Sequence, residues 1–164
     1  MKTNLILLFL LVATALTTTT VRAQTSEETA IRKVLDASRT ASDQRDLNAF
    51  TACFVDSPDL VYQIMTGDHR MIVAHGMDNM KKMVGGYYKA VPAPATPVVH
   101  QTTDYRVRVN GNMATATATM TDGAENSRIQ VVLEKAAQSD GSGAWKILTL
   151  TGTSYETGKL TEVK

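Results

Sequence analysis

The chain has 164 residues, with 17 lysines and arginines against 16 aspartates and glutamates, and a single cysteine, Cys53. This near-neutral balance, without a basic run, argues against nucleic acid or an anionic membrane as the partner of the protein. A single cysteine excludes an intrachain disulfide, so apolar packing has to hold the fold together.

Residues 1–23 are predicted to form a secretory signal peptide. Lys2 supplies a positive start, and an apolar run without charge covers residues 5–16. Val21-Arg22-Ala23 then places small residues before a cut ahead of Gln24, which completes the three-part pattern of such signals. The apolar run is short for a membrane span, so a retained anchor helix is the less favoured alternative.

The expected mature chain is one domain over residues 24–156, followed by a tail over residues 157–164 that has little to bury and should fray. Because the cut removes Lys2 and Arg22, the net charge falls from +1 to about −1. We therefore expect an exported bacterial protein, periplasmic or extracellular, with no membrane contact after cleavage.

The first element after the cut is predicted to be an amphipathic helix of about five turns. Thr25 and Glu28 have the spacing of a capping box at its start. Its apolar face carries, at helical spacing, Ile31, Val34, Leu35, Ser38 and Ala41 or Ser42. Because this face ends in small residues, another part of the protein is expected to fill the space there.

A short second helix is predicted to begin after Asp46, whose side chain can cap it. Leu47, Phe50 and Phe54 lie on one side of that helix, with Cys53 beside them. No cationic side chain neighbours Cys53 in the sequence, so a buried thiol is favoured over a reactive one.

Two short strands and a third helix follow. Residues 60–65 and 71–75 read as strands around a turn at Gly67-Asp68. After Gly76, a helix presents Met80, Met83, Val84 and Tyr87 on one face. Gly85-Gly86 weakens this helix by about 1 kcal/mol per glycine, and three prolines (Pro92, Pro94 and Pro97) then predict an extended connection.

Asn110-Gly111, between two alternating runs, predicts a β-hairpin with a two-residue turn. With that turn, Val109 lies opposite Asn112, Val107 opposite Ala114 and Tyr105 opposite Ala116. These residues form the inner face of the sheet, because side chains alternate along a strand. The outer face then carries Asp104, Arg106 and Arg108, together with His100, which we interpret as a surface residue.

Two further strands complete the predicted sheet. Ile129, Val131 and Leu133 alternate with polar residues in one strand, and residues 145–151 form the last, after a flexible loop at 139–143. Helices that precede an antiparallel sheet are typical of an α+β protein with its helices on one face of the sheet.

This order of elements resembles the nuclear transport factor 2-like superfamily, which includes ketosteroid-isomerase-like and SnoaL-like proteins, and within it the small exported domains of unknown function. The resemblance is carried by Arg45-Asp-Leu-Asn-Ala-Phe-Thr-Ala-Cys-Phe54, by His75-Gly76-Met77, and by the strands around Tyr105–Ala114 and Ala144–Ile147. It covers nearly all of residues 26–156. It implies a cone of curved sheet closed by helices, an apolar pocket inside, and frequent dimerisation through the outer face of the sheet.

Ketosteroid-isomerase relatives use a carboxylate base with a tyrosine and a neutral aspartic acid as donors to the oxyanion. The resemblance places the tyrosine near Ser38, the carboxylate base at Tyr62 or Gln63, and the aspartic acid near Val131 or Val132. None of the three residue types is present, so the chain is not expected to catalyse ketosteroid isomerisation by that mechanism.

His75 and Tyr62 remain weak candidates for acid–base chemistry. His75 follows the second strand at the expected pocket mouth, but a strand-end histidine bonded to backbone is the favoured reading. Asp68-His69 with His75 fits no defined ligand motif, so no metal and no cofactor are expected.

The expected pocket lining combines inward strand positions with the inner side of the third helix. It comprises Tyr62, Met80, Val84, Tyr87, Tyr105, Val131 and Trp145. The alanines of the hairpin leave space opposite these residues, and methionine adapts to ligands of varied shape. Filling of the core by the same side chains is the alternative.

Three apolar residues are predicted to face outward, beside a row of arginines and a lysine: Val132, Leu148 and Leu150. Their outward position favours a homodimer through the outer face of the sheet.

Three functions are compatible with the sequence. The leading one is binding of a small apolar molecule, and the others are a SnoaL-like isomerase, hydrolase or dehydratase, or an association module with a filled core. A pocket of about 300 Å³ or more, lined by Tyr62, Met80 and Tyr105, would favour binding. A carboxylate or histidine in it, within about 3 Å of a second polar group, would favour an enzyme, and we expect no such pair.

Overall fold

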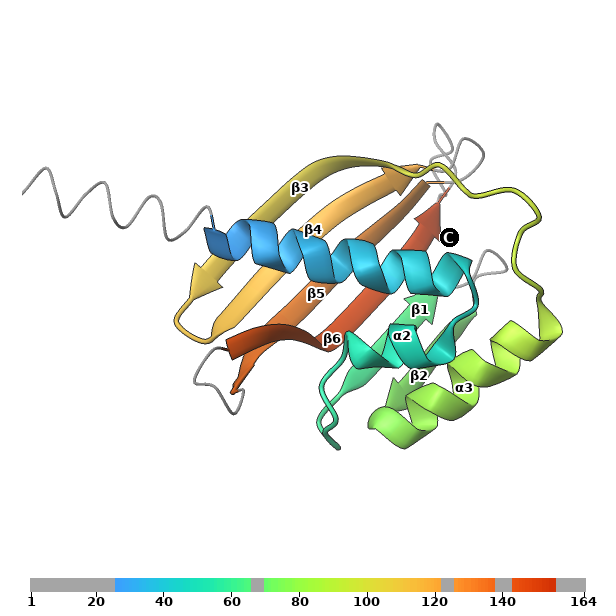
Figure 1. Ribbon diagram of the computed structural model, residues 1–164, viewed down its shortest axis with the longest axis horizontal. Coiled ribbons are helices and arrows are strands. Elements are labelled where there is room, and N and C mark those ends of the chain that lie inside the picture. Colours follow the sequence, from blue (N-terminus) through green and yellow to red (C-terminus); the bar gives the residue numbers. More distant parts are fainter. Residues whose placement is uncertain (1–25, 66–69, 122–125, 138–142, 156–164) are drawn as a thin grey trace, which may run out of the picture.

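The computed structural model describes residues 26–65, 70–121, 126–137 and 143–155 (Figure 1). Within these ranges the chain forms a curved, open sheet of six strands with helices packed on one face, which confirms the α+β prediction. The predicted signal peptide, the turn at Gly67-Asp68 and the C-terminal tail lie outside the described residues.

A long N-terminal helix over residues 26–43 crosses the sheet (Figure 1), as its apolar spacing predicted. The short helix α2 (Leu47–Ala52) follows, and Asp46 caps it by accepting a hydrogen bond from the backbone N–H of Ala49 at 2.9 Å. Helix α3 (Met77–Ala90) lies beside α2. No helix in the described part is both long and apolar enough to span a lipid bilayer.

The sheet has the strand order β2-β1-β6-β5-β4-β3. The short strands β1 (Val61–Met65) and β2 (Met71–His75) pair antiparallel, and β1 joins the sheet parallel to β6. The remaining strands form an antiparallel meander: β3 (Gln101–Asn110), β4 (Met113–Thr121), β5 (Asn126–Ala137) and β6 (Gly143–Tyr155).

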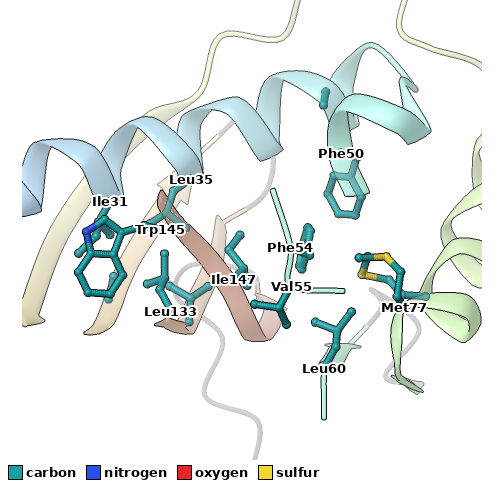
Figure 2. Close-up of a cluster of buried hydrophobic side chains, with 14 of the residues drawn as sticks. Ile31, Leu35, Phe50, Phe54, Val55, Leu60, Met77, Leu133, Trp145 and Ile147 are labelled. Atoms are coloured by element: carbon teal, nitrogen blue, oxygen red, sulfur yellow. The ribbon is translucent and has the colours of Figure 1, made fainter. Parts of the chain in front are cut away.

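The core fills the space between the first half of the N-terminal helix, α2, α3 and the sheet (Figure 2). Ile31, Leu60, Met80, Leu133 and Ile147 are fully buried there. Ser38 and Ala41 are also buried, so the predicted inward stripe of the helix is correct.

The start of the N-terminal helix is fastened to the sheet by Glu27. One carboxylate oxygen accepts a hydrogen bond from Nζ of Lys135 at 2.6 Å, and the other accepts one from Nε1 of Trp145 at 2.5 Å.

The hairpin turn lies one residue later than predicted. Asn110 pairs with Met113, so the central turn residues are Gly111 and Asn112, and Val107 lies opposite Ala116 instead of Ala114. Of these two turn residues, Gly111 alone has a positive φ, of 61°, which fits a turn that needs this conformation only at its first central position. A turn that lies one residue later shifts the β4 partner of each β3 residue by two positions. A shift of two keeps every side chain on the same face, so the facing of Val107 and Val109 is unchanged, and Arg106 and Arg108 are exposed as predicted.

A β-bulge in β3 overturns the prediction for His100. Thr103 pairs with Thr119 and Arg106 with Thr117, so Asp104 and Tyr105 together oppose the single residue between those partners. Asp104 takes the left-handed conformation, with φ of 50°. One extra residue reverses which face the preceding residues point to. His100 and Thr102 therefore face the cavity side of the sheet, with His100 partly buried and Thr102 exposed.

A second bulge, in β6, overturns the prediction for Leu150. Val132 pairs with Thr149 but Leu133 pairs with Ile147, which leaves Leu148 as the extra residue. Trp145 and Ile147 face inward before it, and Leu150 faces inward after it. Leu150 is thus removed from the outer face on which a dimer interface was predicted.

Candidate functional site

A cavity of about 760 Å³ lies between the second half of the N-terminal helix, α3, the connection that follows α3, and the sheet. It opens where the inward stripe of the helix changes from large residues to Ser38 and Ser42, both of which line it. Its apolar walls include Phe50, Ile64, Ile72, Met83, Ile129 and Leu150. Small residues on the helix therefore leave space that no other side chain fills.

Four of the predicted lining residues do line this cavity: Tyr62, Val84, Tyr87 and Tyr105. Met80, Val131 and Trp145 do not, and lie in the packed core. For Trp145 the reason is the size of the residues on the N-terminal helix, because Ile31 and Leu35 fill the space between the first half of this helix and the sheet (Figure 2). Trp145 lies beside Ile31 in that filled part.

His75 lies at the end of β2, exposed to solvent and away from the cavity. Its backbone carbonyl accepts a hydrogen bond from Nδ2 of Asn79 at 2.8 Å. The His75 side chain is therefore not placed to act as an acid or base on a molecule in the cavity.

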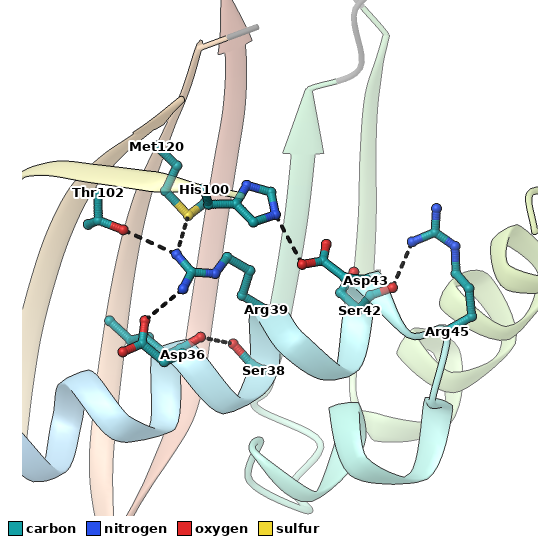
Figure 3. A network of polar contacts seen from close by, with 10 residues as sticks. Asp36, Ser38, Arg39, Ser42, Asp43, Arg45, His100, Thr102 and Met120 are labelled. Atoms are coloured by element: carbon teal, nitrogen blue, oxygen red, sulfur yellow. Dashed lines mark hydrogen bonds and ion pairs between the residues drawn. The ribbon is translucent and has the colours of Figure 1, made fainter. Parts of the chain in front are cut away.

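His100 forms a hydrogen-bonded pair with Asp43 at the cavity wall, contrary to the expectation that no such pair exists (Figure 3). Nε2 of His100 lies 3.0 Å from Oδ2 of Asp43, and the two side chains are 16% and 29% exposed. Asp43 comes from the last turn of the N-terminal helix, and the bulge at Asp104 turns His100 toward it. The sequence signal was weak: aspartate tolerates the left-handed conformation, but its type alone does not locate a bulge.

The pair has a defined proton arrangement when His100 is neutral. An ionised carboxylate only accepts hydrogen bonds, so Nε2 carries the proton that bonds to Asp43. Nδ1 is then unprotonated, and the lone pair on Nδ1 can accept a proton from a bound molecule.

Arg39 forms a second polar group beside this pair (Figure 3). Its guanidinium donates to Oγ1 of Thr102 at 3.1 Å, contacts Sδ of Met120 at 3.9 Å, and pairs with Oδ1 of Asp36 at 3.1 Å. Arg39 therefore links the helix to the ends of β3 and β4 on the wall that holds His100.

Three tyrosines supply hydroxyl groups to the site. Burial raises the pKa of Tyr62, Tyr88 and Tyr105, so all three stay neutral at physiological pH and act as hydrogen-bond donors and acceptors. The hydroxyls of Tyr88 and Tyr105 are buried and neither makes a hydrogen bond of good geometry in the described structure, although Ser42 lies near the first and Arg32 near the second. Unpaired buried hydroxyls are costly, and a ligand with polar groups would satisfy them.

Among the residues that the structure describes, no three His, Cys, Asp or Glu side chains gather in a group that could hold a metal ion. Asp68-His69, considered with His75 for this role, lies outside those residues.

The model of the SnoaL-like domain family matches residues 23–151 of the chain. A comparison with curated proteins returned no match. Solved structures with the same fold include a cystatin-like fold protein from Burkholderia xenovorans, with 16% identity and a TM-score of 0.61, over 79% of this chain and 92% of that one.

Two further solved structures are described as candidate enzymes. A candidate dehydratase of the nuclear transport factor 2-like family from Streptomyces avermitilis has 14% identity and a TM-score of 0.60, over 82% of this chain and 99% of that one. A candidate ketosteroid isomerase from Parabacteroides distasonis has 15% identity and a TM-score of 0.54, over 77% and 88%. At these identities the likeness concerns the fold.

Proposed function

Because the chain belongs to the SnoaL-like domain family, within the nuclear transport factor 2-like superfamily, we propose that its cavity binds a small, largely apolar molecule. The volume of about 760 Å³ carries this proposal, since it lies within the roughly 300–1,000 Å³ of ligand sites. An association module with a filled core would lack such a space.

Fluorescence of N-phenyl-1-naphthylamine, a neutral apolar dye, tests the binding. We expect saturable binding to the wild-type protein and its loss in Ala118→Phe, because Ala118 is a buried residue of the cavity wall and a phenyl ring would fill the space. Thr115→Phe, at an exposed position of the same strand, is the matched control and should bind normally. Equal binding by both variants would place the dye elsewhere and refute the proposal.

A second candidate function is proton-transfer chemistry of the isomerase, hydrolase or dehydratase type, with His100 as the acid–base group. The hydrogen bond between Asp43 and His100 favours it, because a histidine oriented by a carboxylate beside an apolar cavity has the arrangement of a general base. Tyr62, kept neutral by burial, would serve as a donor to the substrate. This assignment replaces His75.

The elimination of 5-nitrobenzisoxazole is a suitable probe, because it needs only a base in an apolar site. The base takes the proton from carbon 3, the N–O bond breaks, and a nitrile and a phenolate form. We expect a rate above that of buffer, lowered about ten-fold or more in His100→Gln and unchanged in His75→Gln. Equal rates in the two variants would exclude His100 as the base.

Export and dimerisation remain predictions. N-terminal sequencing of protein from a bacterial culture tests cleavage before Gln24. Sedimentation equilibrium tests the homodimer, for which Leu150 no longer provides support.

A further inference from the structure

Arg45 has an unusual environment for an arginine on the wall of a cavity. It is half-buried, its Nε donates to the backbone carbonyl of Val91 at 3.1 Å, and its Nη1 donates to that of Ser42 at 2.6 Å. The guanidinium carbon also lies 5.1 and 5.4 Å from the ring centres of Tyr87 and Tyr88. All of these partners are neutral. Within the described ranges no carboxylate pairs with Arg45.

The two hydrogen bonds leave Arg45 with donors to spare. A guanidinium has five N–H groups in a planar fork, and such a fork suits the two oxygens of a carboxylate or sulfonate. Arg45 therefore combines a charge without an ionic partner and unused N–H groups at the side of an apolar space.

The other two arginines of the cavity wall differ in this respect. Arg39 pairs with Asp36 at 3.1 Å. Arg32 lies 4.0 Å from the ring centre of Tyr105, where the charges of Asp36 and Glu28 act on the same tyrosine. An anionic ligand bound at Arg39 or at Arg32 would therefore be repelled by these carboxylates.

Tyr88 supplies a second donor beside Arg45. Its hydroxyl is buried and makes no hydrogen bond of good geometry in the described structure, with the Ser42 side chain as its polar neighbour. Burial is the main cause of the raised pKa of Tyr88, whereas Ser42 and Arg45 lower this pKa. Because the pKa is raised on balance, the phenol stays protonated and able to donate. Desolvation of an unpaired hydroxyl is unfavourable, and an acceptor from a ligand would remove that cost.

Asp43 carries a negative charge that also acts on Tyr88. One of its oxygens is engaged by His100 at 3.0 Å. The wall as a whole carries Arg32, Arg39 and Arg45 against Asp36 and Asp43, which leaves one excess positive charge when His100 is neutral. The balance of charge thus favours an anionic group.

We propose that Arg45 and Tyr88 bind the anionic group of an amphipathic ligand, a carboxylate or sulfonate, whose apolar body fills the cavity. The inference rests on the proposed binding function and specifies its ligand class. Phe50, Met83 and Tyr87 provide aromatic and adaptable apolar surface for the body of the ligand.

A pair of dyes isolates the contribution of the charge. 8-Anilinonaphthalene-1-sulfonate and N-phenyl-1-naphthylamine share one ring system and differ by the sulfonate. We expect the wild-type protein to bind the sulfonate dye about ten-fold more tightly or better, since hydrogen bonds to charged groups have this effect. Near-equal affinities for the two dyes would overturn the inference while leaving the binding function intact.

Single substitutions then identify the residues that cause the preference for the sulfonate dye. Tyr88→Phe removes one hydroxyl without loss of volume and should lower the affinity for the sulfonate dye about three- to ten-fold, with that for the neutral dye unchanged. Arg45→Gln should abolish the preference, and Arg45→Lys should keep part of it because the charge remains. Circular dichroism of each variant verifies the fold.

Arg106→Gln is the matched control, because it removes an arginine from an exposed position outside the cavity wall. It should leave the preference for the sulfonate unchanged. A preference that survives both Tyr88→Phe and Arg45→Gln, or that disappears in Arg106→Gln, would contradict the assignment. If the wild-type protein bound neither dye, the proposed binding function would itself be refuted, and this inference with it.

Discussion

Asp43 at the end of the N-terminal helix and His100 before β3 are 57 residues apart in sequence and 3.0 Å apart in space. Each comes from a segment whose placement depends on the rest of the fold. The helix holds Asp43 over the sheet, and the bulge at Asp104 turns His100 toward it. The pair is partly buried, so its members should be coupled energetically more than a surface pair is.

A double-mutant cycle with Asp43→Asn and His100→Gln should give a coupling energy of about 1 kcal/mol in the free energy of unfolding. Urea denaturation measures it. The more exposed pair of Asp36 and Arg39 serves as the comparison, with about 0.5 kcal/mol or less. A coupling between Asp43 and His100 near zero would mean that their contact does not persist in solution.

The bulge itself can be tested at Asp104. Asp104→Val should lower the free energy of unfolding by about 1–2 kcal/mol, because a β-branched residue is strained at the positive φ found there. Asp104→Gly should have little effect, since glycine adopts this conformation freely. Thr103→Val, at the neighbouring position without positive φ, is the control. Equal losses in the glycine and valine variants would argue against the left-handed conformation.

Acid should weaken the attachment of the N-terminal helix through Glu27. The hydrogen bonds from Lys135 and then from Trp145 hold the pKa of Glu27 below its ordinary value of 4.5 in the folded protein. A depressed folded-state pKa stabilises the fold above the unfolded pKa, and this contribution is lost as pH falls through the folded pKa.

Glu27→Gln should therefore be about 1–2 kcal/mol less stable than the wild type at neutral pH, with the difference shrinking below pH 4.5. Urea denaturation down to about pH 3 follows this change. A stability gap that stays constant across the whole series would show that ionisation of Glu27 contributes nothing.

The two adjacent glycines of α3 should respond differently to alanine. A Cβ at Gly86 would meet nothing within 4 Å, so Gly86→Ala should stabilise the protein by about 0.5–1 kcal/mol through helix propensity. At Gly85 the Cβ would lie 3.1 Å from Cδ2 of Leu47, which offsets the gain. Thermal unfolding of both variants checks the order, and a larger gain at Gly85 would contradict it.

The bulge in β6 predicts which neighbour affects the cavity. Leu150→Ala should change the affinity for N-phenyl-1-naphthylamine, because Leu150 lines the cavity. Thr149→Ala should not, since Thr149 pairs with Val132 on the outward side. The opposite result in dye titrations would restore the original assignment of Leu150 to the outer face.

Much of the fold follows from local patterns that the sequence displays directly. The 3.6-residue spacing from Ile31 to Ala41 predicted the long helix, Asp46 predicted the cap of α2, and alternation predicted the strands and the facing of Arg106 and Arg108. Asn110-Gly111 located the hairpin but misplaced its turn by one residue. Each of these features depends on residues close together in the chain, whose spacing sets which face they share.

The candidate site was predicted only in part. Tyr62, Val84, Tyr87 and Tyr105 lie on its wall as expected, whereas Met80, Val131 and Trp145 lie in the core. Sequence spacing shows which side of an element faces inward. It does not show whether the space beneath is filled, because that depends on what packs from the opposite element.

By itself, the sequence determined the order of helices and strands, the α+β class and the inward side of each regular element. Only the tertiary structure decided where the interior is packed and where it is hollow, and that His100 meets Asp43 and Leu150 faces the cavity. The physical reason is that side-chain facing in a strand has a period of two residues. One extra residue in a bulge reverses it, and the position of that residue is set by pairing with a strand distant in sequence.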